Sequence, residues 1–171
     1  MSVGKPAWRL IVALSLGMAS ASALAEAQAA PDCKLRSLSG DQALSLNSLQ
    51  GQVVYVDFWA SWCPPCLKSF PFMNDLQQRY RDQGLTVVAV NLDENLSDAQ
   101  AFVEKQPAAF PVWVDQDQSC AQAFKVKAMP STYLIDASGV IRHVHAGFRL
   151  DEAETLQAQV ELLLTGSVDA R

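Results

Sequence analysis

The sequence predicts an α/β domain with one mixed central sheet and helices on both faces. Two observations indicate this class: strand-like and helix-like segments alternate through the middle of the chain, and two strands joined by a short turn come near its end. Alternation favours parallel strands connected by helices, whereas the turn favours an antiparallel pair. The 171 residues, 50% of them hydrophobic, are enough for one such domain with a sizeable core.

The start of the chain is predicted to be a secretory signal peptide at residues 1–25. Lys5 and Arg9 precede an apolar run, Leu10–Ser20, and an A-x-A site ends at Ala25. A basic start, a short apolar run and small residues at the end are typical of a cleaved signal, so we expect export to the periplasm. The alternative is an uncleaved membrane anchor, but the run is shorter than the roughly 18 apolar residues of a spanning helix.

The rest of the chain is predicted to form a flexible leader at residues 26–32, one folded domain at 33–166 and a short tail at 167–171. Loss of the signal would remove two of the 13 basic side chains, which leaves 11 against 18 acidic ones. The sequence has no basic stripe, so nucleic acid is not an expected partner.

Each element of the domain follows from a local pattern. A hairpin is expected where two short apolar segments flank the turn sequence SGD, and strands where apolar or β-branched runs end at turn signals. Helices are expected where apolar residues recur three or four positions apart. The predicted order is a hairpin at 33–49, a strand at 51–60, a helix at 63–84, a strand at 85–91, a helix at 97–106, a strand at 110–115, a helix at 118–126, strands at 131–136 and 140–148, and a helix at 151–164.

Two helix starts are predicted from residues at capping-box spacing. Ser97 stands three positions before Gln100, and Asp151 stands three positions before Glu154. Pro71 lies inside the first long helix, where its ring and its missing N–H should produce a kink.

Two cysteines three positions apart, Cys63 and Cys66, stand where the first long strand gives way to a helix. Free N–H groups and the helix dipole favour an anion at a helix start, so a Cys63 thiolate is stabilised there. Cys66 follows one turn later, where its sulfur can approach that of Cys63. The spacing therefore favours a pair that cycles between thiol and disulfide.

The alternatives for this pair are a zinc site, a structural disulfide and two ordinary core cysteines, the last of which would not explain the two prolines or the position between strand and helix. Zinc needs two further ligands, but Cys33 and Cys120 are isolated, and neither His143 nor His145 stands at metal-ligand spacing from a cysteine. A structural link across so short a loop adds little stability. We therefore predict no metal and no cofactor other than the redox-active disulfide. The two histidines alternate along a strand, share one side, and are interpreted as polar edge residues.

The sequence resembles the thioredoxin superfamily around the cysteines and further along the chain. The resemblance lies in VVYVDFWASWCPPC and AMPSTYLID, while PDCKLRSLSGDQALSLNSLQGQVVYV and VVAVNLDEN are similar to the exported TlpA/ResA-like branch. It extends from Pro31 to the last helix. It implies a thioredoxin fold with an N-terminal β-hairpin extension, and thiol:disulfide oxidoreductase activity.

The resemblance also implies roles for residues near the cysteines. Cys63 matches the exposed nucleophile, Cys66 the buried resolving thiol, and Pro130 the proline that follows a cis peptide bond beside them. A cis bond after Met129 would leave the Met129 backbone open to strand-like pairing with a client protein. Trp62 is expected at the surface rim, in contact with the client.

Two acidic residues are candidate proton acceptors. Asp57 matches the buried acid beneath the cysteines of thioredoxins, whereas TlpA-like proteins often have asparagine there. Glu94 matches a glutamate that lines the cavity of ResA-like proteins, with the neighbouring Asp93 as the alternative. A buried carboxylate has a raised pKa and can accept the proton that Cys66 must lose. The other interpretations are a hydrogen-bonded core group for Asp57 and a solvated carboxylate for Glu94.

Cys33 and Cys120 are expected to form a structural disulfide between the hairpin and the helix at 118–126, the alternative being two free thiols. The closed loop would be long, so the chain-entropy model gives a stabilisation of about 4 kcal/mol. Trp59 is expected to pack in the core.

The resemblance implies an exported enzyme that reduces disulfides of client proteins. It also implies a membrane electron donor of the DsbD/CcdA type and clients such as apocytochrome c, in cytochrome c maturation, or a copper-delivery protein; we expect a monomer. Two alternatives stay open: a disulfide-forming oxidant, and a non-enzymatic haem or metal chaperone on the same fold. Pro64 and Pro65 supply no N–H to the Cys63 sulfur, which favours the reductant because a strong oxidant needs a well-stabilised thiolate.

Overall fold

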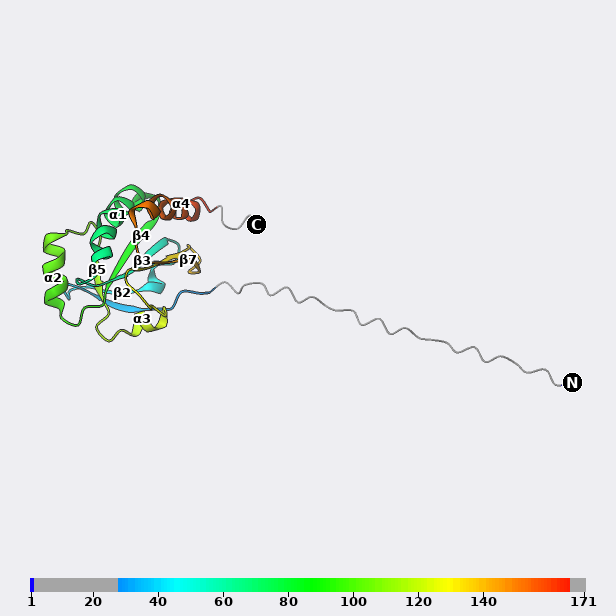
Figure 1. Cartoon of the computed structure of the whole chain (residues 1–171), viewed down its shortest axis with the longest axis horizontal. Coiled ribbons are helices and arrows are strands. Elements are labelled where there is room, and N and C mark those ends of the chain that lie inside the picture. The colour runs from blue at the N-terminus through cyan, green and yellow to red at the C-terminus, as the bar shows by residue number, and fades with distance from the viewer. Residues whose placement is uncertain (2–27, 167–171) are drawn as a thin grey trace.

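The fold is a seven-stranded mixed sheet with helices on both faces, and it confirms the predicted class. The computed structural model describes residue 1 and residues 28–166 (Figure 1). The cleavage site at Ala25 and the tail at 167–171 lie outside the described residues. In this part of the chain the spatial order of the strands is β2-β1-β5-β4-β3-β6-β7. Their bounds are β1 Lys34–Ser37, β2 Ala43–Ser45, β3 Val53–Trp59, β4 Leu85–Asn91, β5 Val112–Val114, β6 Ser131–Ile135 and β7 Ile141–Ala146.

The helices lie between the strands as the sequence pattern predicts. Figure 1 shows α1 and α4 on one side of the sheet and the short α3 on the other. Their bounds are α1 Pro64–Tyr80, α2 Leu96–Lys105, α3 Ser119–Ala123 and α4 Ala153–Leu164, with 3-10 helices η1 at Leu46–Leu49, η2 at Arg81–Gln83 and η3 at Leu150–Glu152.

The strand directions agree with the alternation of strands and helices in the sequence. β3, β4 and β5 are parallel to one another, as helical crossovers require, whereas β6 and β7 are antiparallel to each other and β6 is antiparallel to β3. The N-terminal hairpin forms from β1 and β2, and β1 joins the sheet by antiparallel pairing with β5.

β3 lies inside the sheet, between β4 and β6, and every one of its residues is buried. Successive side chains point to opposite faces. Tyr55 and Trp59 belong to the core cluster formed with α1, α2 and α4, whereas Val56 and Phe58 belong to the cluster on the α3 side. The Trp59 ring lies 4.7 Å from that of Phe70, which confirms that Trp59 packs in the core.

The predicted capping boxes are wrong at both helices. α2 begins one residue earlier, with Asn95 as its N-cap, so Ser97 lies inside the helix. α4 begins after η3, and neither helix has a side-chain cap. The Asp151 carboxylate instead accepts two hydrogen bonds from Arg149, at 3.0 and 2.8 Å, and is not available as a cap. α1 continues through Pro71 to its end at Tyr80.

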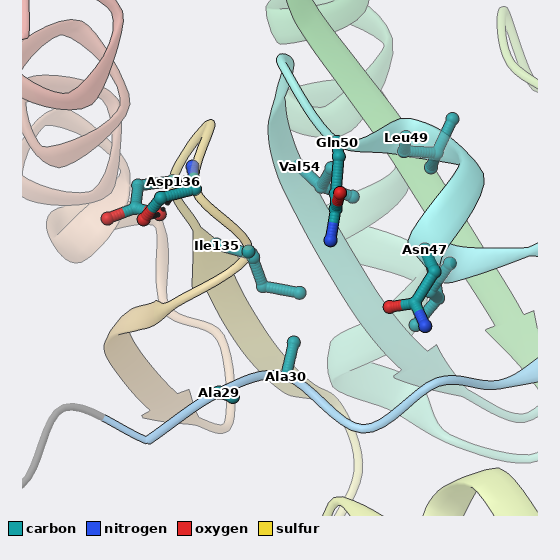
Figure 2. Close-up of a pocket in the computed structure, with 11 residues that line it drawn as sticks. Ala29, Ala30, Asn47, Leu49, Gln50, Val54, Ile135 and Asp136 are labelled. Atoms are coloured by element: carbon teal, nitrogen blue, oxygen red, sulfur yellow. Dashed lines mark hydrogen bonds between the residues drawn. The ribbon is translucent and has the colours of Figure 1, made fainter.

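The described residues of the predicted leader make backbone hydrogen bonds to the turn between β6 and β7 and to the start of β7. The Ala30 N–H donates to the Gly139 carbonyl at 2.8 Å, and the Ile141 N–H donates to Gln28 at 2.9 Å. This segment, η1 and the β6–β7 turn enclose a small pocket of about 110 Å³, in which Figure 2 shows Ala30 across from Ile135. Its lining contains none of the predicted site residues, and the leader here serves to cover the edge of the fold.

Candidate active site

The cysteine pair lies at the junction of β3 and α1. Cys63 is the N-cap of α1, and Pro64 and Pro65 occupy its first two positions. Proline suits these positions because their N–H groups have no partner within a helix. The chain therefore passes from a buried strand to a helix start within residues 60–63, and the first cysteine stands at the positive end of the helix dipole.

Cys63 and Cys66 form a disulfide, with their Cα atoms 5.3 Å apart. The Cys66 N–H donates to the Cys63 sulfur at 3.3 Å. Cys66 is fully buried, as the resemblance implied for a resolving thiol. Cys63, however, is only 2% exposed in this bonded form, so the implied contrast between an exposed and a buried cysteine is not present.

Trp62 and Met129 border the cysteine pair on the outside. Trp62 is 67% exposed and Met129 is half-buried, and both line a pocket of about 310 Å³. A second pocket of about 220 Å³ shares Met129, Leu92 and Gln118 with the first, so the two form one groove. The Met129–Pro130 peptide bond is cis. An exposed aromatic ring and a groove are thus located beside an otherwise covered disulfide.

Asp57 is a fully buried carboxyl group in the middle of β3. It lies between Tyr55 and Trp59 in the strand alternation, on the face that α1 and the cysteines cover. Its Oδ1 accepts a hydrogen bond from the Thr132 hydroxyl at 2.7 Å, whereas Oδ2 has no hydrogen-bond partner among the described residues. Burial raises the pKa of Asp57 to about 7, and the bond from Thr132 offsets part of that rise. This carboxyl group can gain or lose a proton near neutral pH.

Glu94 and Asp93 have different surroundings despite being neighbours. Glu94 is exposed and lines the larger pocket. Asp93 is buried, and its carboxylate accepts hydrogen bonds from the Ser61 N–H at 3.0 and 3.1 Å and from the Asn91 side chain at 2.8 Å. Asp93 therefore holds the loop that precedes Cys63, and Glu94 is left to face solvent in the groove.

The two remaining cysteines, Cys33 and Cys120, form the second disulfide across 87 residues. Each is 3% exposed, and both belong to the core cluster on the α3 side. Asp115 accepts hydrogen bonds from the backbone N–H groups of Cys120 and Ala121, at 3.2 and 2.8 Å. The bridge and this carboxylate together anchor α3, whose neighbouring residues line the groove.

Sequence reasoning missed Thr132, Ser61 and Asp115. Thr132 is paired with Asp57 across β6 and β3, a register that no local pattern encodes. Ser61 looks like an ordinary loop polar residue, and its contact with Asp93 becomes visible only when β3 and β4 lie side by side. Asp115 contacts N–H groups only five and six residues further along the chain, at the start of α3. Their polarity next to buried strands was the one available signal.

The two histidines of the described residues lie on β7. His143 and His145 share one side of the edge strand β7, as predicted, with their rings 6.3 Å apart. Burial lowers the pKa of His143. His145 approaches Glu152 at 3.2 Å. Within residues 28–166, no three His, Cys, Asp or Glu side chains are grouped to hold a metal ion, and no helix there is long and apolar enough to cross a membrane.

Comparison with known proteins connects this geometry to a family. The family model described as Redoxin matches residues 25–160. The chain is 33% identical over 126 residues to the thiol-disulfide oxidoreductase ResA of Geobacillus kaustophilus, covering 74% of this chain and 72% of that one. It is 36% identical over 150 residues to the thioredoxin-like protein YneN of Bacillus subtilis, covering 86% and 85%.

A solved structure has a similar fold. The crystal structure described as thiol:disulfide interchange protein DsbE from Chlorobium tepidum superposes with a TM-score of 0.77 and 42% sequence identity, covering 81% of this chain and 96% of that one. The chain therefore belongs to the Redoxin family and is a thiol-disulfide oxidoreductase of the ResA and DsbE kind.

Proposed function

We propose that this protein is exported to the periplasm, where the Cys63–Cys66 pair reduces disulfides of client proteins. The observation that carries the direction is the number of N–H groups available to the Cys63 sulfur. Pro64 and Pro65 have none, so in the first turn of α1 the Cys66 N–H is the donor to that sulfur. A thiolate with few donors is less stabilised, which favours the disulfide form and gives the dithiol more reducing power.

The reduction proceeds in two exchanges. The Cys63 thiolate attacks one sulfur of the client disulfide, forms a mixed disulfide and releases the other client sulfur as a thiolate. Cys66 then loses its proton and attacks the Cys63 sulfur, so the bond from Cys63 to the client breaks and the second client thiolate leaves. The client gains two electrons, and the enzyme ends with the Cys63–Cys66 disulfide.

Asp57 accepts the proton that Cys66 loses. It is located on the same face of the sheet as the core cluster that includes Cys66, and its Oδ2 is free to take a proton. A carboxyl group with a pKa of about 7 is ionised in half of the molecules near neutral pH and can both accept and return this proton. Asp57 thus serves as the general base of the resolving step.

The client docks along the groove at Met129. Trp62 supplies an exposed apolar face next to Cys63, and Leu92 and Met129 supply the apolar floor shared by both pockets. Glu94 borders one end of the groove and Lys127 the other. An extended client segment beside Met129 would place its disulfide near the covered Cys63 sulfur.

Repeated turnover needs a source of electrons, because each cycle leaves the enzyme oxidised. We propose a membrane donor of the DsbD/CcdA type, which would reduce Cys63–Cys66 by the same exchange. Apocytochrome c and copper-delivery proteins are the proposed clients, and the protein acts as a monomer. Cys33–Cys120 takes no part in the proposed cycle, because it joins segments 87 residues apart and has the role of a structural link.

The reduction potential of Cys63–Cys66, measured against glutathione or dithiothreitol buffers, tests the direction. We expect a value well below the roughly −120 mV of DsbA. Pro65→Ala restores one N–H at the start of α1 and should raise the potential by about 20 mV, since one hydrogen bond is worth about 1 kcal/mol. Pro71→Ala, which changes a proline of the same helix beyond its first turn, is the matched control and should leave the potential unchanged. A wild-type potential close to that of DsbA would reverse the proposed direction.

A further inference from the structure

Three buried side chains on the cysteine-facing side of the sheet form a chain of hydrogen bonds. The Thr132 hydroxyl donates to Oδ1 of Asp57 at 2.7 Å, and the Tyr55 hydroxyl lies 3.3 Å from the Thr132 oxygen. All three are buried, with Tyr55 and Asp57 fully so. Thr132 is held opposite Asp57 by the antiparallel register of β6 and β3.

We propose that Thr132 is a positioning residue for the redox reaction, which engages Oδ1 of Asp57 and leaves Oδ2 as the atom that takes the Cys66 proton. This inference rests on the proposed role of Asp57 and deepens it. Thr132 touches neither the client nor the sulfurs in the proposed reaction. It acts through the carboxylate alone.

The number of protons available fixes which group donates in each of these two hydrogen bonds. A threonine hydroxyl has one proton, and a carboxylate can only accept, so the Thr132 proton is committed to ionised Asp57. The Tyr55 hydroxyl must then donate to Thr132, which increases the polarity of the Thr132 hydroxyl. Burial raises the pKa of Tyr55, so this tyrosine stays protonated and remains a donor. The chain therefore stabilises the charged form of Asp57.

Few other titratable groups face Asp57. On its own strand Tyr55 does, and α1 contributes Cys63 and Cys66 to the same core cluster. On β4 its partner is Ala89, and α4 contributes apolar residues to this face. On β7, His145 pairs with Thr132 and contacts Glu152, so His145 is the group to control for.

Loss of the Thr132 hydroxyl should make Asp57 a poorer proton acceptor at neutral pH. Without that bond the buried carboxylate keeps its full burial penalty, so its pKa rises above about 7. A hydrogen bond to a charged group corresponds to roughly one pKa unit or more. At pH 7 the ionised fraction would then fall from about one half to about one tenth, and the resolving step would slow about fivefold.

The reduced protein and the chromogenic disulfide 5,5′-dithiobis(2-nitrobenzoate) separate the two exchanges in one absorbance trace. The first thionitrobenzoate is released when Cys63 attacks, and the second when Cys66 resolves the mixed disulfide. In Thr132→Val we expect the pH midpoint of the second phase to rise by about one unit, with the first phase unchanged. Thr132→Ser keeps the hydroxyl and should keep the wild-type midpoint. His145→Gln should also keep it.

An Asp57→Asn background shows whether Thr132 acts through the carboxylate. Asp57→Asn should slow the second phase at neutral pH, and adding Thr132→Val should then change nothing further. A uniform slowing in Thr132→Val with an unchanged midpoint would overturn the inference. If Asp57→Asn leaves the second phase intact, the proposed role of Asp57 fails instead. If Thr132→Val does not fold, Tyr55→Phe is the second test. A smaller upward shift of the pH midpoint supports the inferred hydrogen-bond chain, and an unchanged midpoint contradicts it.

Discussion

The two disulfides of this protein have similar outward geometry but different surroundings. Cys63–Cys66 and Cys33–Cys120 both have Cα atoms 5.3 Å apart, and all four residues are at most 3% exposed. One closes a single helical turn beside an exposed tryptophan and a groove, whereas the other joins segments 87 residues apart inside the α3-side core. Neither the exposure of the cysteines nor position at a helix start separates the two disulfides, because Cys120 is the second residue of α3. They differ in the length of the loop that each closes and in the exposed Trp62 next to Cys63.

Each disulfide also has a buried aspartate, and these differ in the same way. Both carboxylate oxygens of Asp115 accept hydrogen bonds from backbone N–H groups, those of Cys120 and Ala121. One oxygen of Asp57 accepts a hydrogen bond from Thr132, and the other has no hydrogen-bond partner among residues 28–166. The first aspartate is a helix anchor, and the second is free to exchange a proton. One residue type serves two purposes because the donors around it differ.

Loss of activity should separate the two disulfides most strongly. Cys63→Ser removes the nucleophile and should lower dithiothreitol-driven reduction of insulin disulfides by roughly a thousandfold or more. Cys66→Ser should instead leave the client attached to Cys63 as a mixed disulfide, which a non-reducing gel and peptide mass mapping would identify. The double variant Cys33→Ser/Cys120→Ser is the control and should retain activity. Loss of exchange chemistry in that control at a temperature where it stays folded would break the comparison.

Stability should change in the opposite order. The loop closed by Cys33–Cys120 spans 87 residues, so in the chain-entropy model its removal lowers the free energy of unfolding by about 4.5 kcal/mol. Removal of Cys63–Cys66, which closes a separation of 3 residues, should cost about 1.6 kcal/mol in the same model. Urea unfolding of the two double serine variants measures both values. Equal losses of unfolding free energy would mean that the Cys63–Cys66 disulfide also stabilises the fold.

The two aspartates should respond differently to replacement by asparagine. The pKa of Asp57 is raised from 3.8 to about 7, so the folded state binds the extra proton between these values and stability falls as pH rises through that range. Asp57→Asn should therefore raise the free energy of unfolding by about 4 kcal/mol well above pH 7, and the gain should vanish below about pH 4.

Asp115→Asn is the matched variant for this comparison. Burial raises the pKa of Asp115 as well, but both of its oxygens accept N–H groups, and an amide can accept with one oxygen only. We expect a loss of about 1 kcal/mol near neutral pH, the usual value of a helix cap. Urea unfolding across pH 4 to 9 measures both variants, and a gain for Asp115→Asn would show that burial outweighs the N–H donors there.

Much of the fold could be predicted because its signals are local. Buried strands, helical spacing and turn sequences each extend over a few residues, and the predicted element order matches the observed one. Helix starts were predicted less well, because Arg149 competes for Asp151 and because η3 precedes α4.

In the site, too, features with a local signal could be predicted and contacts between distant segments could not. The position of Cys63 and Cys66 at a helix start followed from the sequence, since a spacing of three residues equals about one helical turn wherever the helix lies. The pairing of Asp57 with Thr132, and that of Asp93 with Ser61, did not follow from it. Those contacts join strands and loops that are distant in sequence, and a shift of register by one residue would turn each side chain to the other face.

By itself, then, the sequence determined the α/β class, the junction at which the cysteines meet, and the absence of N–H groups at the two prolines between them. Only the tertiary structure decided that Asp93 holds the loop before Cys63, and that Oδ2 of Asp57 has no hydrogen-bond partner among residues 28–166. The physical reason is range. Propensity and spacing act over one turn or one strand, whereas burial and hydrogen-bond partners depend on which segments the sheet brings together.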